Sequence, residues 1–328
     1  MTKLLSRQDI INLLEMTDAI NILENAFADL SEGRAILPVR TSIPVPDHNG
    51  SALYMPAYLS GPGALGIKVV TVYQENMKRY GLPTISGTII LMDEKSGIPI
   101  AVMEGSYLTA VRTGAVSGLA TKLLSRKESK VHALFGTGGM SRAHALAIDS
   151  VRNIEKIIVF SLDPVEIRNE FKHSLEQIVK SEIIIAGSAE EAARGADIVT
   201  LITTSKRPVI DGNWISPGTH INGAGSHEPF SREIDTKTVV RSKIICDLLE
   251  ACKTEAGDLI IPVEEKMWGW EKVHASLGDL ITKKKTARES SEEITLFKTV
   301  GLAIQDLSVA QHVYNKSVEL NAGTNFNF

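Results

Sequence analysis

Residues 130–148 read KVHALFGTGGMSRAHALAI, which is a short apolar strand, a glycine-rich turn and the start of a helix. Gly136, Gly138 and Ser141 form the pattern GxGxx followed by a small residue. Such a turn lets the backbone approach a pyrophosphate, which then lies on the N–H groups of the following helix. A second strand-like run, KIIVF, ends at Phe160, at the spacing expected of a dinucleotide-binding unit. The residues predicted to contact a dinucleotide in this turn are Gly136, Gly138, Gly139, Met140 and Ser141.

The alternation of strand and helix continues towards the C-terminus. Residues 182–204 predict a strand, a short helix with Ser188 and Glu191 as a capping box, and another strand. The segments THINGAG (219–225) and SKIICD (242–247) are two further strand-like runs. Strands that alternate with helices at this spacing predict a doubly wound parallel sheet, which is the Rossmann type of α/β fold.

The first third of the chain has a different pattern. Its first thirty residues predict helix, with Ser6 as an N-cap and a stop at Gly33. A restart of the helix is expected at Thr17 or Asp18. Short β-like runs follow without the long helices that parallel strands need, so an antiparallel or mixed sheet is expected. These runs are RTSIPV (40–45), SALYMPAY (51–58), ALGIKVVTVY (64–73) and the hairpin GTIILMDEKSGIPIAVME (87–104).

Two longer helices complete the predicted elements. Residues 106–125 are rich in alanine and other small residues and predict a buried helix, whereas residues 301–320 predict an amphipathic helix. No linker interrupts the chain, so the last helix is expected to return to the first domain. We therefore expect a Rossmann domain of residues 115–299 and a second, α+β domain of residues 1–114 plus 300–328.

The composition limits the classes of function. The chain has 328 residues, of which 43% are apolar and 23% charged, and its net charge of −4 gives no basic footprint for nucleic acid. No apolar run is long enough to span a membrane, and the N-terminus lacks a signal-peptide core. Cys246 and Cys252 form no CxxC pair, and the histidines show no ligand spacing. We therefore expect a cytoplasmic protein with no metal site, no membrane contact and no nucleic-acid partner.

The segment after the second strand bears on the choice of nucleotide. An acidic residue there normally binds the ribose 2′-hydroxyl of NAD, whereas an Arg with small polar residues accepts the 2′-phosphate of NADP. Ser161 and Asp163 follow Phe160, and the carboxylate of Asp163 would repel a phosphate. We therefore favour NAD, with Ser161 and Asp163 as contacts. Arg168, further along the helix, leaves NADP open.

Three segments in one register resemble a known family. RTGAVSGLATKLL (112–124), the glycine-rich turn and EITLFKTVGLAIQDLSVA (293–310) resemble the ornithine cyclodeaminase/mu-crystallin family, and the similarity covers nearly the whole chain. The resemblance implies a homodimer, in which a Rossmann domain is joined to a domain that binds substrate and forms the dimer. It also implies hydride transfer between NAD(P) and the α-carbon of a small amino or imino acid.

Three basic residues match the substrate site of that family. The resemblance implies that Arg40, Lys68 and Arg112 hold the α-carboxylate of the substrate. An Arg can grip a carboxylate through two parallel hydrogen bonds. Lys68 stands in an apolar strand, where burial would lower its pKa and suit it to proton transfer at neutral pH. The other residues expected to contact the dinucleotide are Thr113, Thr203 and Ala224.

One position departs from the family pattern. INGAGSHEPF (221–230) follows a strand of the Rossmann domain, at the carboxyl edge where ligands gather. In cyclodeaminases and the alanine dehydrogenase of the family, an Asp stands at the position that aligns with His227. A carboxylate suits the distal ammonium of ornithine, whereas an imidazole can donate a proton to an imine nitrogen as hydride arrives at carbon. His227 therefore favours imine reduction, or its reverse, over cyclodeamination.

These inferences together predict an enzyme. We expect an NAD(P)-dependent oxidoreductase of the ketimine reductase or alanine dehydrogenase kind, with Lys68 and His227 as its catalytic residues. Two alternatives stay open. One is an ornithine cyclodeaminase, which converts L-ornithine to L-proline and ammonia. The other is a mu-crystallin-like protein that sequesters a small ligand, although the intact set of Arg40, Lys68 and Arg112 argues against binding alone.

Overall fold

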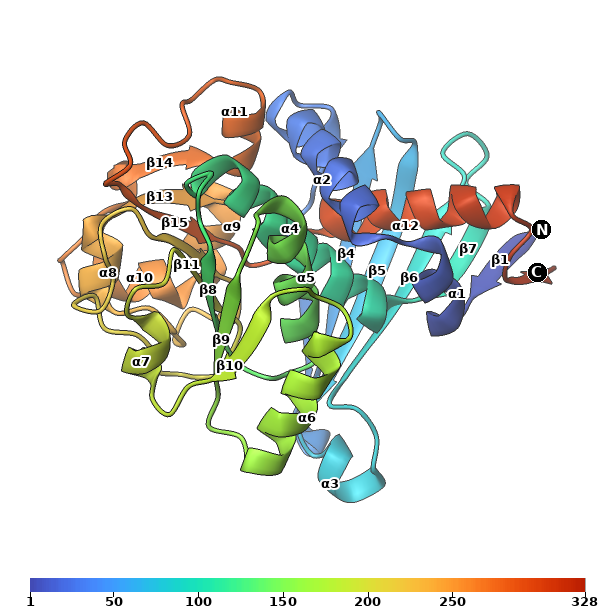
Figure 1. Cartoon of the computed structure of the whole chain (residues 1–328). Helices are drawn as coiled ribbons and strands as arrows, with labels where there is room; N and C mark the ends of the chain where they lie inside the picture. Colours follow the sequence, from blue (N-terminus) through green and yellow to red (C-terminus); the bar gives the residue numbers. More distant parts are fainter. Residues whose placement is uncertain (328) are drawn as a thin grey trace. The chain divides into compact units, whose positions relative to one another are not determined.

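The computed structural model describes residues 1–327 and divides into two compact units. Unit 1 comprises Met1–Arg112 and the segment that starts at Leu302, and unit 2 comprises Thr113–Gly301. The divisions fall at residue 112 rather than 114, and at residue 301 rather than 299. Figure 1 shows the elements of each unit, coloured along the sequence.

Unit 2 is built on an eight-stranded sheet in which every neighbouring pair of strands is parallel. The strand order is β10-β9-β8-β11-β12-β15-β13-β14. The first strand in the chain, β8, thus lies inside the sheet, with β9 and β10 on one side of it and the later strands on the other. The predicted doubly wound parallel sheet is therefore confirmed. Its strands are β8 (Val131–Phe135), β9 (Lys156–Phe160), β10 (Glu182–Ile185), β11 (Ile198–Leu201), β12 (His220–Gly223), β13 (Ser242–Cys246), β14 (Val273–Ser276) and β15 (Ile294–Lys298).

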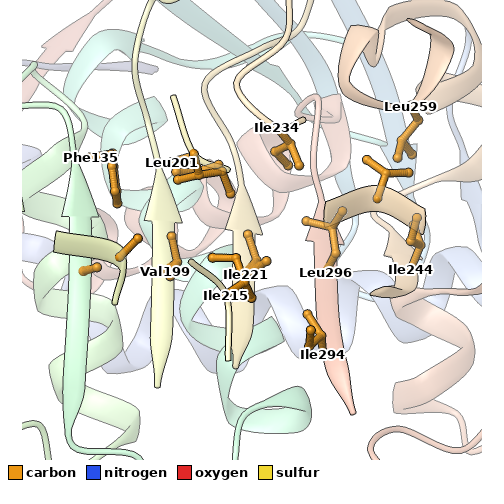
Figure 2. Close-up of a cluster of buried hydrophobic side chains, with 14 of the residues drawn as sticks. Phe135, Val199, Leu201, Ile215, Ile221, Ile234, Ile244, Leu259, Ile294 and Leu296 are labelled. Atoms are coloured by element: carbon orange, nitrogen blue, oxygen red, sulfur yellow. The ribbon is translucent and has the colours of Figure 1, made fainter. Parts of the chain in front are cut away.

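Apolar side chains leave both faces of this sheet, because residues along a strand alternate between its faces. Phe135 belongs to a buried cluster with Val199 and Ile221, shown in Figure 2, whereas its neighbour Leu134 belongs to a second cluster with Phe171. Helices cover each face. They are α5 (Ser141–Val151), α6 (Val165–Glu176), α7 (Ala189–Ala193), α8 (Thr236–Arg241), α9 (Leu249–Glu255), α10 (Gly257–Glu264), the 3₁₀ helix η2 (Trp270–Lys272) and α11 (Leu277–Ile281).

Unit 1 contains a mixed sheet, as the sequence predicts. Its strands follow the order β16-β1-β7-β6-β5-β4-β2, with β3 also paired to β4. Among the described strands of this sheet, β1 and β7 are parallel and all other pairs are antiparallel. They are β1 (Thr2–Leu5), β2 (Ala35–Ile36), β3 (Thr41–Val45), β4 (Gly50–Leu59), β5 (Ala64–Tyr73), β6 (Ile85–Met92), β7 (Pro99–Glu104) and β16 (Thr324–Phe326). The helices are α1 (Arg7–Leu13), α2 (Met16–Ser31), the 3₁₀ helix η1 (Pro46–His48), α3 (Asn76–Tyr80) and α12 (Ala303–Glu319).

Helix α12 lies along this sheet and also contacts α2 (Figure 1). The last helix thus returns to the unit that contains the N-terminus, because its buried side chains pack against β4, β5 and β6. Two details differ from expectation. Helix α2 begins at Met16 rather than at Thr17 or Asp18, and the backbone N–H of Ala19 donates to the oxygen of Glu15 in its first turn. Strand β1 was not predicted, since these residues were expected to be helical. No helix among residues 1–327 is both long and apolar enough to cross a membrane.

Helix α4 (Gly105–Leu124) begins in unit 1 and ends in unit 2. Its second half is anchored by buried polar groups. Asn222 on β12 donates a hydrogen bond of 3.0 Å to the hydroxyl of Thr121, and its amide oxygen lies 3.2 Å from Nε2 of His220. Burial lowers the pKa of His220 to about 3, so this ring is neutral at pH 7. The side-chain amide of Asn222 therefore has two neutral partners, Thr121 and His220.

Arg152 closes the C-terminal end of α4. Its guanidinium donates hydrogen bonds of 2.9 to 3.1 Å to four backbone oxygens, those of Thr121, Lys122, Ser125 and Arg126. The last carbonyls of a helix have no partner within the helix, and a cation there also meets the negative end of the helix dipole. Arg152 therefore fixes the point where α4 ends in unit 2.

Arg152→Ala is expected to lower the free energy of unfolding by about 2–4 kcal/mol, because several backbone oxygens lose a charged donor. Urea unfolding followed by circular dichroism measures this change. Arg194→Ala is the matched control, since Arg194 pairs with Glu190 on an exposed face and its loss is expected to change stability by less than about 0.5 kcal/mol. Equal losses in the two variants would contradict the capping role.

Candidate functional site

The glycine-rich turn after β8 has the geometry that close approach to a phosphate requires. Gly136 has a φ of +107°, and a Cβ there would collide with the backbone oxygen of Ile202. At Gly138 and Gly139 no other atom lies within 4 Å of the position a Cβ would take, and both residues are exposed. The backbone is therefore accessible at the two glycines that face outward, which fits a dinucleotide pyrophosphate.

Helix α5 starts directly after this turn. Met140 is its N-cap residue, and no side chain caps the helix. Ser141 is fully buried, and a Cβ on Gly114 would meet the backbone of Ala143, so α4 and α5 approach each other closely through small residues. An N-terminus with no side-chain cap and a positive dipole end is suited to an anionic group.

Polar groups gather where β9 ends. The hydroxyls of Thr137 and Ser161 both donate hydrogen bonds to the carboxylate of Asp163, the second at 2.7 Å. These bonds, that from Thr137 first, lower the pKa of Asp163, so the carboxylate is charged at neutral pH. The negative charge of Asp163 thus accepts hydrogen bonds from both the glycine-rich turn and the end of β9. It lies at the place in a Rossmann unit where the ribose of the nucleotide is recognised.

His227 lies in an exposed loop after β12. Its ring atom Nδ1 is 3.3 Å from the backbone oxygen of Gly225. Because a carbonyl oxygen only accepts, this contact as a hydrogen bond requires the proton on Nδ1, which leaves Nε2 of the neutral ring as an acceptor. In that arrangement Nε2 donates a proton only when the ring is an imidazolium. Thr203 follows β11 and Ala224 follows β12, so both residues also belong to the carboxyl edge of the sheet.

Unit 1 holds a buried cluster of charge. Lys68 on β5 and Arg112 on α4 are 2% and 5% exposed, and both bind Asp306 on α12, which is fully buried. The carboxylate oxygens of Asp306 lie 2.8 Å from Nζ of Lys68 and 2.9 Å from Nε of Arg112. The guanidinium also donates to the amide oxygen of Gln305. One carboxylate thus serves two buried cations, so the cluster keeps a net positive charge when Lys68 is protonated.

The predicted lowering of the pKa of Lys68 is confirmed. Burial lowers it to about 8, the Asp306 carboxylate opposes that effect, and the positive charges of Arg112 and Arg40 add to the lowering. Lys68 therefore exchanges its proton close to neutral pH. Arg40 itself is half-buried, directly before β3.

The structure thus distributes the predicted residues over the two units. Unit 1 contains Arg40, Lys68 and Arg112, and the boundary falls directly before Thr113. Sequence reasoning missed Asp306, although a lone Asp in the apolar run GLAIQDLSVA was a usable signal, since a buried carboxylate requires a cation. Among residues 1–327 no group of three or more His, Cys, Asp or Glu is placed to hold a metal ion.

Comparison with known proteins adds four findings. The model of the ornithine cyclodeaminase/mu-crystallin family matches residues 1–321. The chain is 38% identical to a Δ1-pyrroline-2-carboxylate reductase of Bacillus cereus over 318 residues, 97% of each protein. Among solved structures, it is 43% identical to Δ1-pyrroline-2-carboxylate reductase of Thermococcus litoralis in complex with NADH and L-proline, with a TM-score of 0.96 over 99% of this chain and 100% of that one. An archaeal alanine dehydrogenase dimer with bound NAD is 34% identical, with a TM-score of 0.93 over 100% and 99%.

Asp306→Asn is expected to lower the free energy of unfolding by about 3–5 kcal/mol, because it leaves two buried cations without an anion. The pKa of Lys68 is expected to fall further, since Asp306 is the group that raises it. Urea unfolding at pH 7 measures the first effect. The matched control is Asp18→Asn, which removes a partly exposed partner 2.7 Å from Lys316 on the same helix α12 and is expected to lose at most about 1 kcal/mol. A loss from Asp306→Asn as small as the control's would refute a charged cluster.

Proposed function

Because the chain belongs to the ornithine cyclodeaminase/mu-crystallin family, we propose that it is an NAD(P)-dependent oxidoreductase acting at the α-carbon of a small imino acid. The first candidate substrate is Δ1-pyrroline-2-carboxylate, reduced to L-proline. Two relatives support this choice, since the enzymes from Bacillus cereus and Thermococcus litoralis that carry this activity are 38% and 43% identical to the chain.

The buried cluster of unit 1 is the observation that carries the proposal. A carboxylate next to a reacting centre needs a fixed cation, and Lys68 and Arg112 are cations fixed by Asp306. The guanidinium of Arg112 has five N–H donors, so its bonds to Asp306 and Gln305 leave donors for a substrate carboxylate. Arg40 adds positive potential. The cluster would therefore bind the α-carboxylate of an imino acid.

Reduction of an imine needs a hydride at carbon and a proton at nitrogen. Bound NADH would supply the hydride, and the glycine-rich turn with the start of α5 would hold its pyrophosphate. Lys68 is the first candidate for the proton at nitrogen, because a pKa of about 8 keeps it protonated at neutral pH and still able to release the proton. His227 is the second, acting as an imidazolium from its exposed loop.

A second candidate function is amino-acid dehydrogenation of the alanine dehydrogenase kind. The archaeal alanine dehydrogenase, at 34% identity over the whole chain, favours it. It would use the same carboxylate site with an acyclic imine. Cyclodeamination of ornithine is less well supported, because His227 cannot offer the distal ammonium a carboxylate.

We also propose that the chain works as a homodimer in a reducing compartment such as the cytoplasm. The alanine dehydrogenase relative is a dimer, and unit 1 exposes apolar side chains on its sheet and the segments beside it. These side chains are Ile36, Val39, Ile43 and Ile85. Cys246 and Cys252 are both buried and not joined by a disulfide, which fits a reducing compartment.

The reaction is tested by absorbance at 340 nm with NADH and Δ1-pyrroline-2-carboxylate. We expect NADH oxidation, with kcat/KM reduced at least about 100-fold in Lys68→Met, because a general acid and a carboxylate contact are both removed. Lys3→Met is the matched control, since Lys3 is another buried lysine of unit 1 and donates to the backbone oxygen of Ala322. It is expected to keep its activity.

The pH profile makes this test sharper. Because protonated Lys68 is the donor, kcat/KM for reduction is expected to fall as pH rises through about 8, and the limb is expected to vanish in Lys68→Met. Oxidation of NADH with pyruvate plus ammonia, and none with the cyclic imine, would favour the alanine dehydrogenase alternative. Conversion of ornithine to proline without net change in NADH would overturn the proposal.

We expect the enzyme to prefer NADH over NADPH, because the charged carboxylate of Asp163 would bind a ribose hydroxyl and repel a 2′-phosphate. Asp163→Ser is expected to raise the KM for NADH about tenfold, which corresponds to one lost charge-assisted hydrogen bond, and to lower the KM for NADPH. Steady-state kinetics with both nucleotides measures the change. Glu170→Gln, on the exposed side of α6, is the control, and a preference unchanged in Asp163→Ser would refute this assignment.

A further inference from the structure

Three of the fully buried charged side chains of unit 2 interact at the carboxyl end of its sheet. Glu233, Asp258 on α10 and Lys298 on β15 each have zero exposure. Their chain neighbours Ile234 and Leu259 are apolar, and Figure 2 shows both towards the arrowhead ends of the strands. The mechanism above assigns no role to these three charges, and an isolated charge in such a place is strongly unfavourable.

The carboxylate of Glu233 joins the segments that follow two neighbouring strands. One oxygen accepts hydrogen bonds from the backbone N–H and the hydroxyl of Thr203, after β11, at 2.6 and 2.8 Å. The other accepts from the backbone N–H groups of Gly225 and Ser226, after β12, at 2.8 and 3.0 Å. Four donors therefore converge on one side chain, and both oxygens must be acceptors at once.

Asp258 and Lys298 hold this arrangement in place. Asp258 accepts hydrogen bonds from the backbone N–H groups of Glu233 and Ile234, at 2.7 and 3.0 Å. Lys298 pairs with Asp258 at 2.7 Å and donates to the backbone oxygen of Ser226 at 2.6 Å. The loop that carries His227 is thus bound on one side through its N–H groups and on the other through a carbonyl. Both attachments lead to the same three charges.

Stability alone does not require such a network. Replacing buried ion pairs by apolar residues of similar volume is often neutral or stabilising, so buried charges are better understood through what they orient. The packing at the turn is close, since a Cβ on Gly225 would collide with the backbone oxygen of Thr203 and with the carboxylate of Glu233. The network therefore specifies one conformation for the two segments.

We infer that Glu233 is a positioning residue for the reaction proposed above, which holds Thr203 and the loop of His227 in the conformation that binds the nucleotide and transfers the proton. The inference rests on the proposed function. It assigns no contact between Glu233 and the substrate or the nucleotide. Its action is through the backbone of residues that lie at the carboxyl edge, where ligands of a Rossmann sheet bind.

The ionisation of Glu233 would control this hold. Burial first, and the negative charge of Asp258 second, raise its pKa to about 7, while Lys298 and the hydrogen bonds of Thr203 oppose the rise. The charged groups that face it come from α10 and β15, and the segments after β11 and β12 present N–H groups and a hydroxyl. A protonated carboxyl would place an O–H against one of these donors. Below about pH 7 the loop would therefore lose part of its attachment.

Glu233→Gln tests the inference, because an amide has the shape of the protonated carboxyl. We expect kcat/KM for imine reduction by the full-length wild type to fall as pH drops through about 7. In Glu233→Gln we expect that acidic limb to be absent, and kcat/KM above pH 7 to be reduced about tenfold or more, as for one or more lost charge-assisted hydrogen bonds. The basic limb from Lys68 is expected to remain.

The matched control is Asp197→Asn. Asp197 directly precedes β11, and its carboxylate accepts hydrogen bonds from the backbone N–H groups of Lys130 and Val131, so it joins segments at the opposite edge of the same sheet. We expect this variant to lower the melting temperature and to keep the wild-type pH profile. A purely structural role for Glu233 would give the same result in both variants.

Thr203→Val covers the case in which Glu233→Gln does not fold. It removes the hydroxyl that favours the charged carboxylate and keeps the backbone N–H, so the acidic limb is expected to move to higher pH. An active wild type whose acidic limb persists in Glu233→Gln, or is unmoved in Thr203→Val, would overturn the inference. A wild type that oxidises no NADH with any imine would instead overturn the proposed function.

Discussion

The carboxylate of Asp306 is shared by the two buried cations of unit 1, and the proposed chemistry depends on that sharing. Without water, Lys68 and Arg112 could not both stay charged unless an anion lay between them. With a single anion for two cations, the cluster remains positive and in the proposed reaction would attract a substrate carboxylate. The same balance sets the pKa of Lys68 close to neutrality. In the proposed reaction, substrate binding and proton transfer would therefore both depend on one arrangement of charge.

Unit 2 also contains a buried charge cluster, in which the carboxylates outnumber the cations. There the negative charges of two carboxylates, Asp258 and Glu233, act on one ammonium, that of Lys298, and the network holds backbone rather than substrate. Glu233 is ionised above a pH of about 7, and Lys68 is protonated below about 8. Ionised Glu233 and protonated Lys68 are therefore present together most fully between pH values of about 7 and about 8. The proposed enzyme would thus be tuned to the slightly alkaline side of neutrality by two groups that belong to different units.

Local patterns in the sequence were sufficient for most of the fold. The turn at Gly136 and the alternation of strands and helices predicted the parallel sheet, because glycine spacing and apolar runs are properties of neighbouring residues. Strand β1 was missed, since four residues give too little periodicity and its pairing with β7 is distant in sequence. Asp306 and Glu233 were missed for the same reason. Their partners lie far away along the chain, and only folding reveals that the carboxylates are buried.

The two cysteines have a practical consequence for labelling this protein. Cys246 and Cys252 are both buried, and burial together with the neighbouring Cys246 raises the pKa of the Cys252 thiol well above its usual value. The thiolate is the form that reacts with maleimides, so neither native residue is expected to take up a dye while the protein is folded. One surface cysteine added to each unit could then be labelled without replacing the native pair.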